Sequence, residues 1–116
     1  MTIQRQHLEQ IDFSDVPEGA DLMPPVTPGE ILRTDFMEPL GLSANALAKA
    51  LHVPPNRITA ILNGTRSITA DTALRLARYF KTTPQSWLNL QKNYELEVAK
   101  RTVGRAIETE VEPYAA

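Results

Sequence analysis

The sequence predicts an all-α fold of five helices. Three observations favour it: apolar residues recur at helical spacing, residues that cap helices stand before these stretches, and no segment of useful length alternates apolar with polar residues. With 116 residues the chain is long enough for one domain with a modest core, and without cysteine that core has no disulfide. We therefore expect a single helical domain.

The first helix is expected to begin at Thr27. This threonine is an N-cap, Pro28 suits the first helical position, and Glu30 completes a capping box. Pro39 and Gly41 are expected to end the helix, because proline and glycine rarely continue one.

The second and third helices are predicted on either side of a short turn. Ser43 caps the second helix, which stops by His52. Pro54-Pro55 cannot lie inside a helix but suits a first turn, so the third helix begins there and runs to Asn63-Gly64. It is about nine residues long.

The fourth and fifth helices follow the same rules. Thr69 is the expected cap of the fourth, and Thr83-Pro84 repeats the arrangement of cap and proline at the start of the fifth. Gly104 is expected to end the fifth helix. Its apolar stripe is predicted to be the seam of a dimer, or equally to lie inside one subunit's core: Trp87, Leu90, Tyr94 and Val98.

The charges divide the chain into three parts. Residues 1–26 hold one base and five acids, a net charge of -4, and are expected to form an N-terminal acidic arm. Residues 102–116 hold one base and three acids and are expected to be an acidic C-terminal tail. Between them lies the predicted domain, residues 27–101, in which residues 43–81 hold six bases and one acid, a net charge of +5. Such a patch is typical of nucleic-acid binding, although a solvated basic surface has the same composition.

The stretch from Leu42 to Asn63 has the spacing of a helix-turn-helix. A small residue, Ala48, stands midway along the first helix of this motif, where the second must cross closely, and Ile58 and Ile61 on the second helix can close the corner. His52 occupies a turn position that is often glycine, and histidine tolerates the left-handed conformation better than a β-branched residue. Spacing alone also permits an ordinary helical corner without DNA binding.

Several runs in order make the likeness specific. TPGEIL, EPLGLS, NRI, ILNG, ITADTALRLARYF and WLNLQ resemble the HigA (also called VapI) antitoxins, a branch of the lambda-repressor-like, XRE-type helix-turn-helix family. The resemblance covers about residues 26–100. It implies a five-helix DNA-binding domain, a homodimer, repression of the chain's own operon, and neutralisation of a partner toxin that resembles ribosome-dependent mRNA endonucleases.

The resemblance also implies roles for individual residues. The recognition helix would be Pro55 to Asn63, with Asn56 reading adenine through its carboxamide and Arg57 taking guanine or a phosphate. Lys49 and Arg66 would contact phosphates, which position the protein without specifying a sequence. The expected DNA contacts are Ser43, Asn45, Lys49, Asn56, Arg57, Thr59, Asn63 and Arg66. Their alternative role is ordinary exposed helix polarity.

The sequence departs from the family at three positions. Ala44 stands where many relatives carry a glutamine that bonds the DNA backbone, and Pro55 and Ala60 replace positions that are commonly polar. These departures remove hydrogen-bond donors, so they bear on affinity more than on fold.

Three hypotheses for the function can be stated: two are binding functions and the third, which the sequence supports least, is an enzyme. The first is a dimeric operator-binding antitoxin and the second a stand-alone transcription regulator; a toxin gene beside the chain's own gene would distinguish them. No catalytic constellation, metal site or cofactor is expected, because His7 and His52 lie far apart with no ligand-spaced carboxylates. The acidic arm is expected to contact the toxin, since a protein that binds mRNA is basic. The alternatives are an arm that packs on its own domain or is solvated, and toxin contact through the helical core.

The sequence also predicts where the protein acts. No run approaches the roughly 20 apolar residues of a membrane span, so we expect no membrane partner and a cytoplasmic location.

Overall fold

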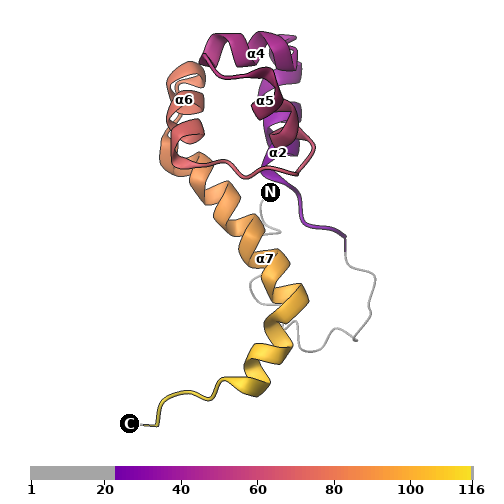
Figure 1. The fold of residues 1–116 in the computed structure, drawn as a ribbon, viewed down its shortest axis with the longest axis vertical. Helices are drawn as coiled ribbons and strands as arrows, with labels where there is room; N and C mark the ends of the chain where they lie inside the picture. The colour runs from indigo at the N-terminus through magenta and orange to yellow at the C-terminus, as the bar shows by residue number, and fades with distance from the viewer. Residues whose placement is uncertain (1–22, 116) are drawn as a thin grey trace, which may run out of the picture.

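The computed structural model describes residues 23–115, which are helical apart from the connecting turns and the two ends (Figure 1). The elements in chain order are α2 (Pro28–Ile31), the π-helical segment η2 (Leu32–Met37), α3 (Glu38–Leu40), α4 (Ala44–Leu51), α5 (Pro55–Leu62), α6 (Ala70–Phe80) and α7 (Pro84–Glu110). Since α2, η2 and α3 follow one another without a break, they form the predicted first helix. The described part of the chain thus has the five predicted helices and no strand, which confirms the all-α fold.

Most helix starts use the caps that the sequence predicts. The hydroxyls of Thr27, Ser43 and Thr83 each accept a hydrogen bond of 3.1 Å from the backbone N–H three residues later. Thr69 also stands directly before its helix in extended backbone, but its hydroxyl accepts no such bond. It marks the start of α6 without capping it through its side chain.

The first helix contains a π-helical segment that the periodicity did not predict. Its last turn is closed by the N–H of Glu38, which donates to the carbonyl of Arg33, five residues earlier. The helix then ends as expected at Gly41, whose φ of 66° is in the left-handed region.

The predicted end of the fifth helix at Gly104 is wrong. Gly104 lies inside α7, which continues to Glu110. A glycine within a helix costs about 1 kcal/mol relative to alanine, and the good helix formers on both sides outweigh that cost. The predicted domain boundary at residue 101 therefore falls within a continuous helix, and the extended segment begins at Val111.

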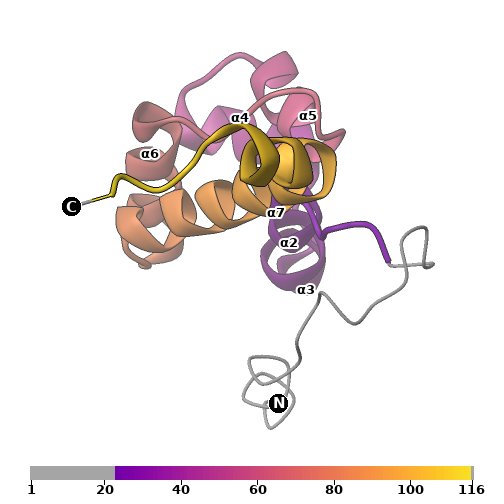
Figure 2. The ribbon, with the colours of Figure 1, turned by 90° about the horizontal axis from the view of Figure 1, so that it is seen from below.

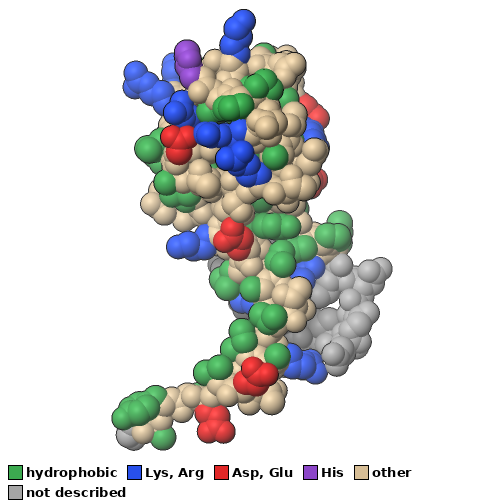
Figure 3. All heavy atoms as spheres, viewed as in Figure 1, with side chains coloured by type: hydrophobic (Ala, Val, Ile, Leu, Met, Phe, Trp, Pro, Cys, Tyr) green, Lys and Arg blue, Asp and Glu red, His purple; other side chains and the backbone are tan. Residues whose placement is uncertain are grey.

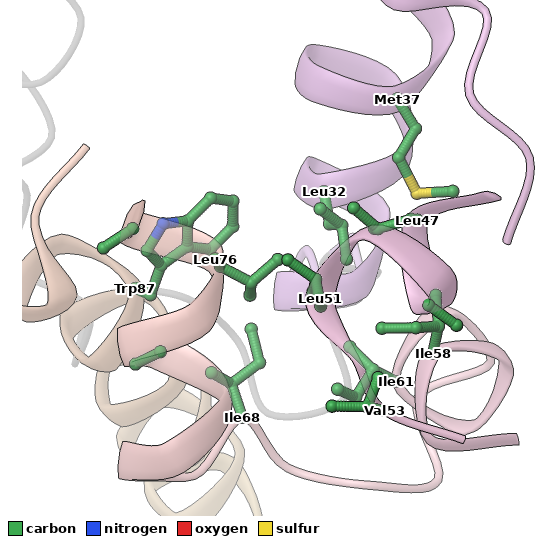
Figure 4. Close-up of a cluster of buried hydrophobic side chains, with 13 residues drawn as sticks. Leu32, Met37, Leu47, Leu51, Val53, Ile58, Ile61, Ile68, Leu76 and Trp87 are labelled. Carbon is green, nitrogen blue, oxygen red and sulfur yellow. The ribbon is translucent and has the colours of Figure 1, made fainter. Parts of the chain in front are cut away.

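The core lies between the first helix, α4, α5, α6 and the first half of α7 (Figure 4). Phe36, Phe80 and Trp87 meet at its edge, with the ring centroid of Phe36 5.1 Å from that of Phe80 and 4.8 Å from that of Trp87. The Trp87 indole N–H donates to the hydroxyl of Thr82 at 2.7 Å, so its one polar group is satisfied. The buried apolar residues are Leu32, Met37, Leu47, Ala48, Leu51, Val53, Ile58, Ile61, Ile68, Ala73, Leu76, Ala77 and Trp87.

The second half of α7 projects from the body that the other helices form with its first half (Figure 1), and in the view from below it lies in front of that body (Figure 2). The first described residue lies against it, because the Arg101 guanidinium donates to the carbonyl of Met23 at 2.6 Å. Arg101 also pairs with Glu97 one turn earlier at 2.9 Å, the i, i+4 contact expected of those residue types.

Candidate nucleic-acid interface

The turn between α4 and α5 has the geometry of a helix-turn-helix. Ala48 is fully buried midway along α4, where the sequence predicts a small residue because α5 must cross α4 closely. His52 has φ 59° and ψ 48°, the left-handed conformation usually supplied by glycine. Its N–H bonds the carbonyls of Ala48 and Lys49, and the N–H of Val53 bonds that of Ala48 at 3.0 Å. The prediction that histidine serves as the turn residue is confirmed.

One face of α5 is buried and the other is exposed. Ile58 and Ile61 lie in the core, whereas Asn56, Thr59 and Asn63 face outward. The Thr59 hydroxyl donates to carbonyls of its own helix, at 3.3 Å to Asn56 and 3.4 Å to Pro55. Its proton is thus engaged, and Asn56 presents the exposed carboxamide in the first turn of the helix.

Arg57, in contrast, is turned toward the neighbouring helix. Its Nη1 donates to Asp71 Oδ2 on α6 at 2.7 Å, and only 23% of its side chain is exposed. Its Nε is buried and has no hydrogen-bond partner. The structure therefore places Arg57 against a carboxylate instead of on the exposed face with Asn56.

The other predicted contacts surround α5. Asn45 and Lys49 are exposed on α4, and Ser43 is exposed at the start of that helix, where its hydroxyl is already the cap. Arg66 is exposed in the loop between α5 and α6. The buried Gln91 of α7 holds this loop in place, because its Oε1 accepts a hydrogen bond from the Ile68 N–H at 2.8 Å.

Two residues next to the site were not singled out by the sequence analysis. Asp71 joins Arg57 to Arg75, whose Nε donates to the same Oδ2 at 3.0 Å. Arg75 also donates through Nη1 to the carbonyl of Leu51 at 2.8 Å, at the end of α4. The i, i+4 spacing of Asp71 and Arg75 could have indicated their pairing, but nothing in the sequence indicates the contact with Arg57, fourteen residues away.

The charges of the body are predominantly positive. Lys and Arg side chains gather on the part of the molecule formed by α4, α5 and α6 (Figure 3), which agrees with the net charge of residues 43–81. Among residues 23–115 no group of three His, Asp or Glu side chains is arranged to hold a metal ion. None of the helices described is long and apolar enough to cross a membrane.

Known proteins resemble this chain in sequence and in fold. The sequence model of a helix-turn-helix family matches residues 35–87. Virulence-associated protein I of Dichelobacter nodosus is 57% identical over 86 residues, which are 74% of this chain and 80% of that protein. A solved addiction module antidote protein of the HigA family from Coxiella burnetii has a TM-score of 0.75 and 58% identity, covering 79% of this chain and all of that one. The Pseudomonas aeruginosa antitoxin HigA, solved with the higBA promoter, has a TM-score of 0.76 and 45% identity over 78% of this chain and 99% of that chain.

Proposed function

This chain belongs to the HigA/VapI family of helix-turn-helix proteins, and from that membership we propose that it is the antitoxin of a toxin–antitoxin module, a homodimer that binds its own operator and neutralises a cognate toxin. The observation that carries the proposal is the likeness to the P. aeruginosa antitoxin, which covers nearly all of that chain and was solved with promoter DNA. In this role the protein acts by binding its operator and its toxin, and we expect it to do so in the cytoplasm.

The DNA-binding part of the proposal uses α5 as the recognition helix. In helix-turn-helix proteins the N-terminal residues of this helix reach base edges in the major groove. Asn56 has the exposed carboxamide and the position for that role, and Thr59 and Asn63 follow on the same outer surface. Lys49 and Arg66 are exposed on neighbouring elements and carry the charges that phosphates require.

We propose that the dimer interface lies further toward the C-terminal end of α7 than the sequence predicts. Trp87 is buried in its own subunit's core, so it cannot belong to the seam, and Leu90, Tyr94 and Val98 are half-buried. Three large apolar residues remain about half exposed on α7 at helical spacing: Leu96 at 52%, Val103 at 45% and Ile107 at 49%.

We propose that the α7 helices of two copies pack antiparallel through this apolar stripe. With the two-fold axis near residues 101 and 102, Leu96 of one copy lies opposite Ile107 of the other. The same register brings the exposed Lys92 to within one residue of the exposed Glu110 of the other copy. Such a self-complementary contact would bring two recognition helices onto an inverted repeat.

The toxin part of the proposal rests on the family and on charge. A toxin that cleaves mRNA has a basic surface, which an acidic segment complements. Most of the acidic arm, residues 1–22, lies outside the described residues; Met23, where the described chain begins, is bonded to α7. We assign toxin contact to this arm and operator contact to the domain.

Co-expression with the product of the neighbouring gene tests the proposal. The neighbour alone is expected to arrest growth, and this chain is expected to restore growth and to form a stable complex with it. A chain lacking residues 1–24 is expected to bind the operator normally and to rescue poorly. A harmless neighbour, together with intact operator binding, would instead identify a stand-alone regulator.

A further inference from the structure

Three charged side chains join the recognition helix to the two helices beside it. Asp71 on α6 accepts hydrogen bonds from Arg57 on α5 at 2.7 Å and from Arg75 on its own helix at 3.0 Å, both at the same oxygen. Arg75 continues the chain of contacts to the Leu51 carbonyl at 2.8 Å. One carboxylate therefore holds the side chain of Arg57 close to the body of the protein.

Arg57 is the only charged residue of α5. It stands next to Asn56 in the first turn, so a free guanidinium at this position would lie beside any nucleic acid that α5 contacts. Instead most of its side chain is covered, and its charge is compensated by Asp71. The positive charge that α5 presents on its exposed face is thus smaller than its one arginine suggests.

We propose that Asp71 withholds Arg57 from the DNA phosphates and so lowers the sequence-independent part of the affinity for DNA. The proposal rests on the proposed operator binding. A phosphate contact gives affinity without sequence information. Withholding such a contact lowers the affinity for DNA of every sequence by about the same factor, and discrimination between sequences is left to uncharged side chains such as Asn56.

The salt dependence of DNA binding distinguishes this role of Asp71 from a purely structural one. Each phosphate that a protein neutralises releases counterions and adds about 0.9 to the slope of log affinity against log salt. If Asp71 keeps Arg57 paired, loss of the Asp71 charge frees this arginine to contact a phosphate. Binding to any sequence should then become stronger and more salt-dependent. A merely structural role for Asp71 predicts the opposite, because a displaced recognition helix would bind all DNA more weakly.

The test compares Asp71→Asn with wild type on two duplexes of equal length and composition: the promoter region of the chain's own gene, and a scrambled version of it. Fluorescence anisotropy from about 50 to 250 mM salt gives both affinities and both slopes. Asp71→Asn is expected to raise affinity for the scrambled duplex roughly three- to tenfold and to steepen its slope by about one. Promoter affinity should rise by about the same factor, so the ratio of the two affinities should stay nearly constant.

Three further variants isolate Arg57 as the cause. Arg57→Ala in the wild-type background should change the slope by less than half a unit, whereas in the Asp71→Asn background it should restore the wild-type slope. Glu97→Gln makes the same change of net charge while breaking a close acid–arginine pair on α7, and should leave the slope unchanged. Asp71→Ser provides a second neutral side chain, and thermal melts verify that each variant is folded.

Several outcomes would overturn the proposal. Folded Asp71→Asn and Asp71→Ser proteins with weaker binding to both duplexes, or with an unchanged slope, would make Asp71 only structural. A full unit of slope lost by Arg57→Ala alone would mean that Arg57 already contacts phosphate. Failure of the proposed operator binding has a separate signature, equal wild-type affinity for promoter and scrambled duplex, and the slopes on the scrambled duplex then still test the role of Asp71.

Discussion

Gly29, in the first turn of α2, lies directly against the backbone of Ile61 at the end of α5. A Cβ at Gly29 would stand 2.8 Å from the carbonyl carbon of Ile61 and 2.9 Å from the Cα of Leu62, and nearer still to the Ile61 oxygen. Since real side chains do not approach backbone so closely, the contact between these two helices requires glycine here. The orientation of α5 thus depends on a residue outside the helix-turn-helix.

We predict that Gly29→Ala lowers the free energy of unfolding by about 2–3 kcal/mol, because overpacking against backbone forces helices apart. Gly104→Ala is the matched control. The nearest atom to its added methyl group is 3.9 Å away, on the side chain of Lys100, and alanine is the better helix former, so a gain of about 0.5–1 kcal/mol is expected. Urea denaturation measures both. Equal effects at the two glycines would mean that the close approach does not constrain packing.

We predict that the contribution of Asp71 to stability disappears in acid. Hydrogen bonds from Arg75 and then Arg57 lower the pKa of this carboxyl below its ordinary value of 3.8, against a smaller opposing effect of desolvation. A depressed folded-state pKa stabilises the fold above the unfolded-state value, and this stabilisation is lost as the pH falls through the folded-state value. The melting temperature of wild type should exceed that of Asp71→Asn by a constant margin from about pH 5 to 7, and the margin should shrink below pH 3.8 and disappear once the pH falls below the folded-state pKa. A margin that persists in strong acid would mean that the Asp71 charge is not its source.

We predict that Asn56→Ala removes about 1–3 kcal/mol of discrimination at a single base pair and leaves non-specific binding nearly intact, because a carboxamide reads adenine at two points. Competition against operator variants that each differ at one base pair identifies that position. Thr59→Ala is a useful comparison, since the Thr59 hydroxyl already bonds its own helix and should contribute less. Parallel losses on specific and non-specific DNA would mean that Asn56 positions the helix without reading a base.

We predict that Val103→Asp and Ile107→Asp convert a dimer into a monomer at about 10 µM, because each places a charge in an apolar seam. Leu40→Asp is the control, since Leu40 is also an exposed apolar residue but lies on α3. Multi-angle light scattering gives the mass in each case. A monomeric wild type, or dimers that survive both substitutions, would remove the outer stripe of α7 from the proposed interface.

The local features of the fold could be predicted from the sequence because they depend on a few adjacent residues. Caps at Thr27, Ser43 and Thr83 and the left-handed turn at His52 follow from residue type and spacing. The π-helical segment did not follow, because one widened turn barely changes an apolar period. The predicted helix end at Gly104 was wrong because the weak tendency of glycine to end a helix was outweighed by the helix-forming residues on both sides.

The candidate site was predictable only in part. Its exposed members, such as Asn56 and Lys49, follow from their place on a helix whose other face is apolar. The pairing of Arg57 with Asp71 could not be predicted, since it depends on how α6 packs against α5 after the loop between them. The contact of Gly29 with Ile61 is of the same kind, because tertiary packing brings together residues that are far apart in the sequence.

The unbroken course of α7 has a mechanical consequence. From Trp87, fixed in the core, to Glu110 the helix spans about 35 Å, at 1.5 Å per residue. Its far end is thus held at a set distance and rotational phase relative to the body. Two residues inserted between the packed and projecting halves would turn the far end by about 200° and carry its apolar face to the other side, whereas seven would advance it about 10 Å with little rotation. Whatever binds at the far end of α7 is therefore placed relative to α5 by the number of residues in one helix.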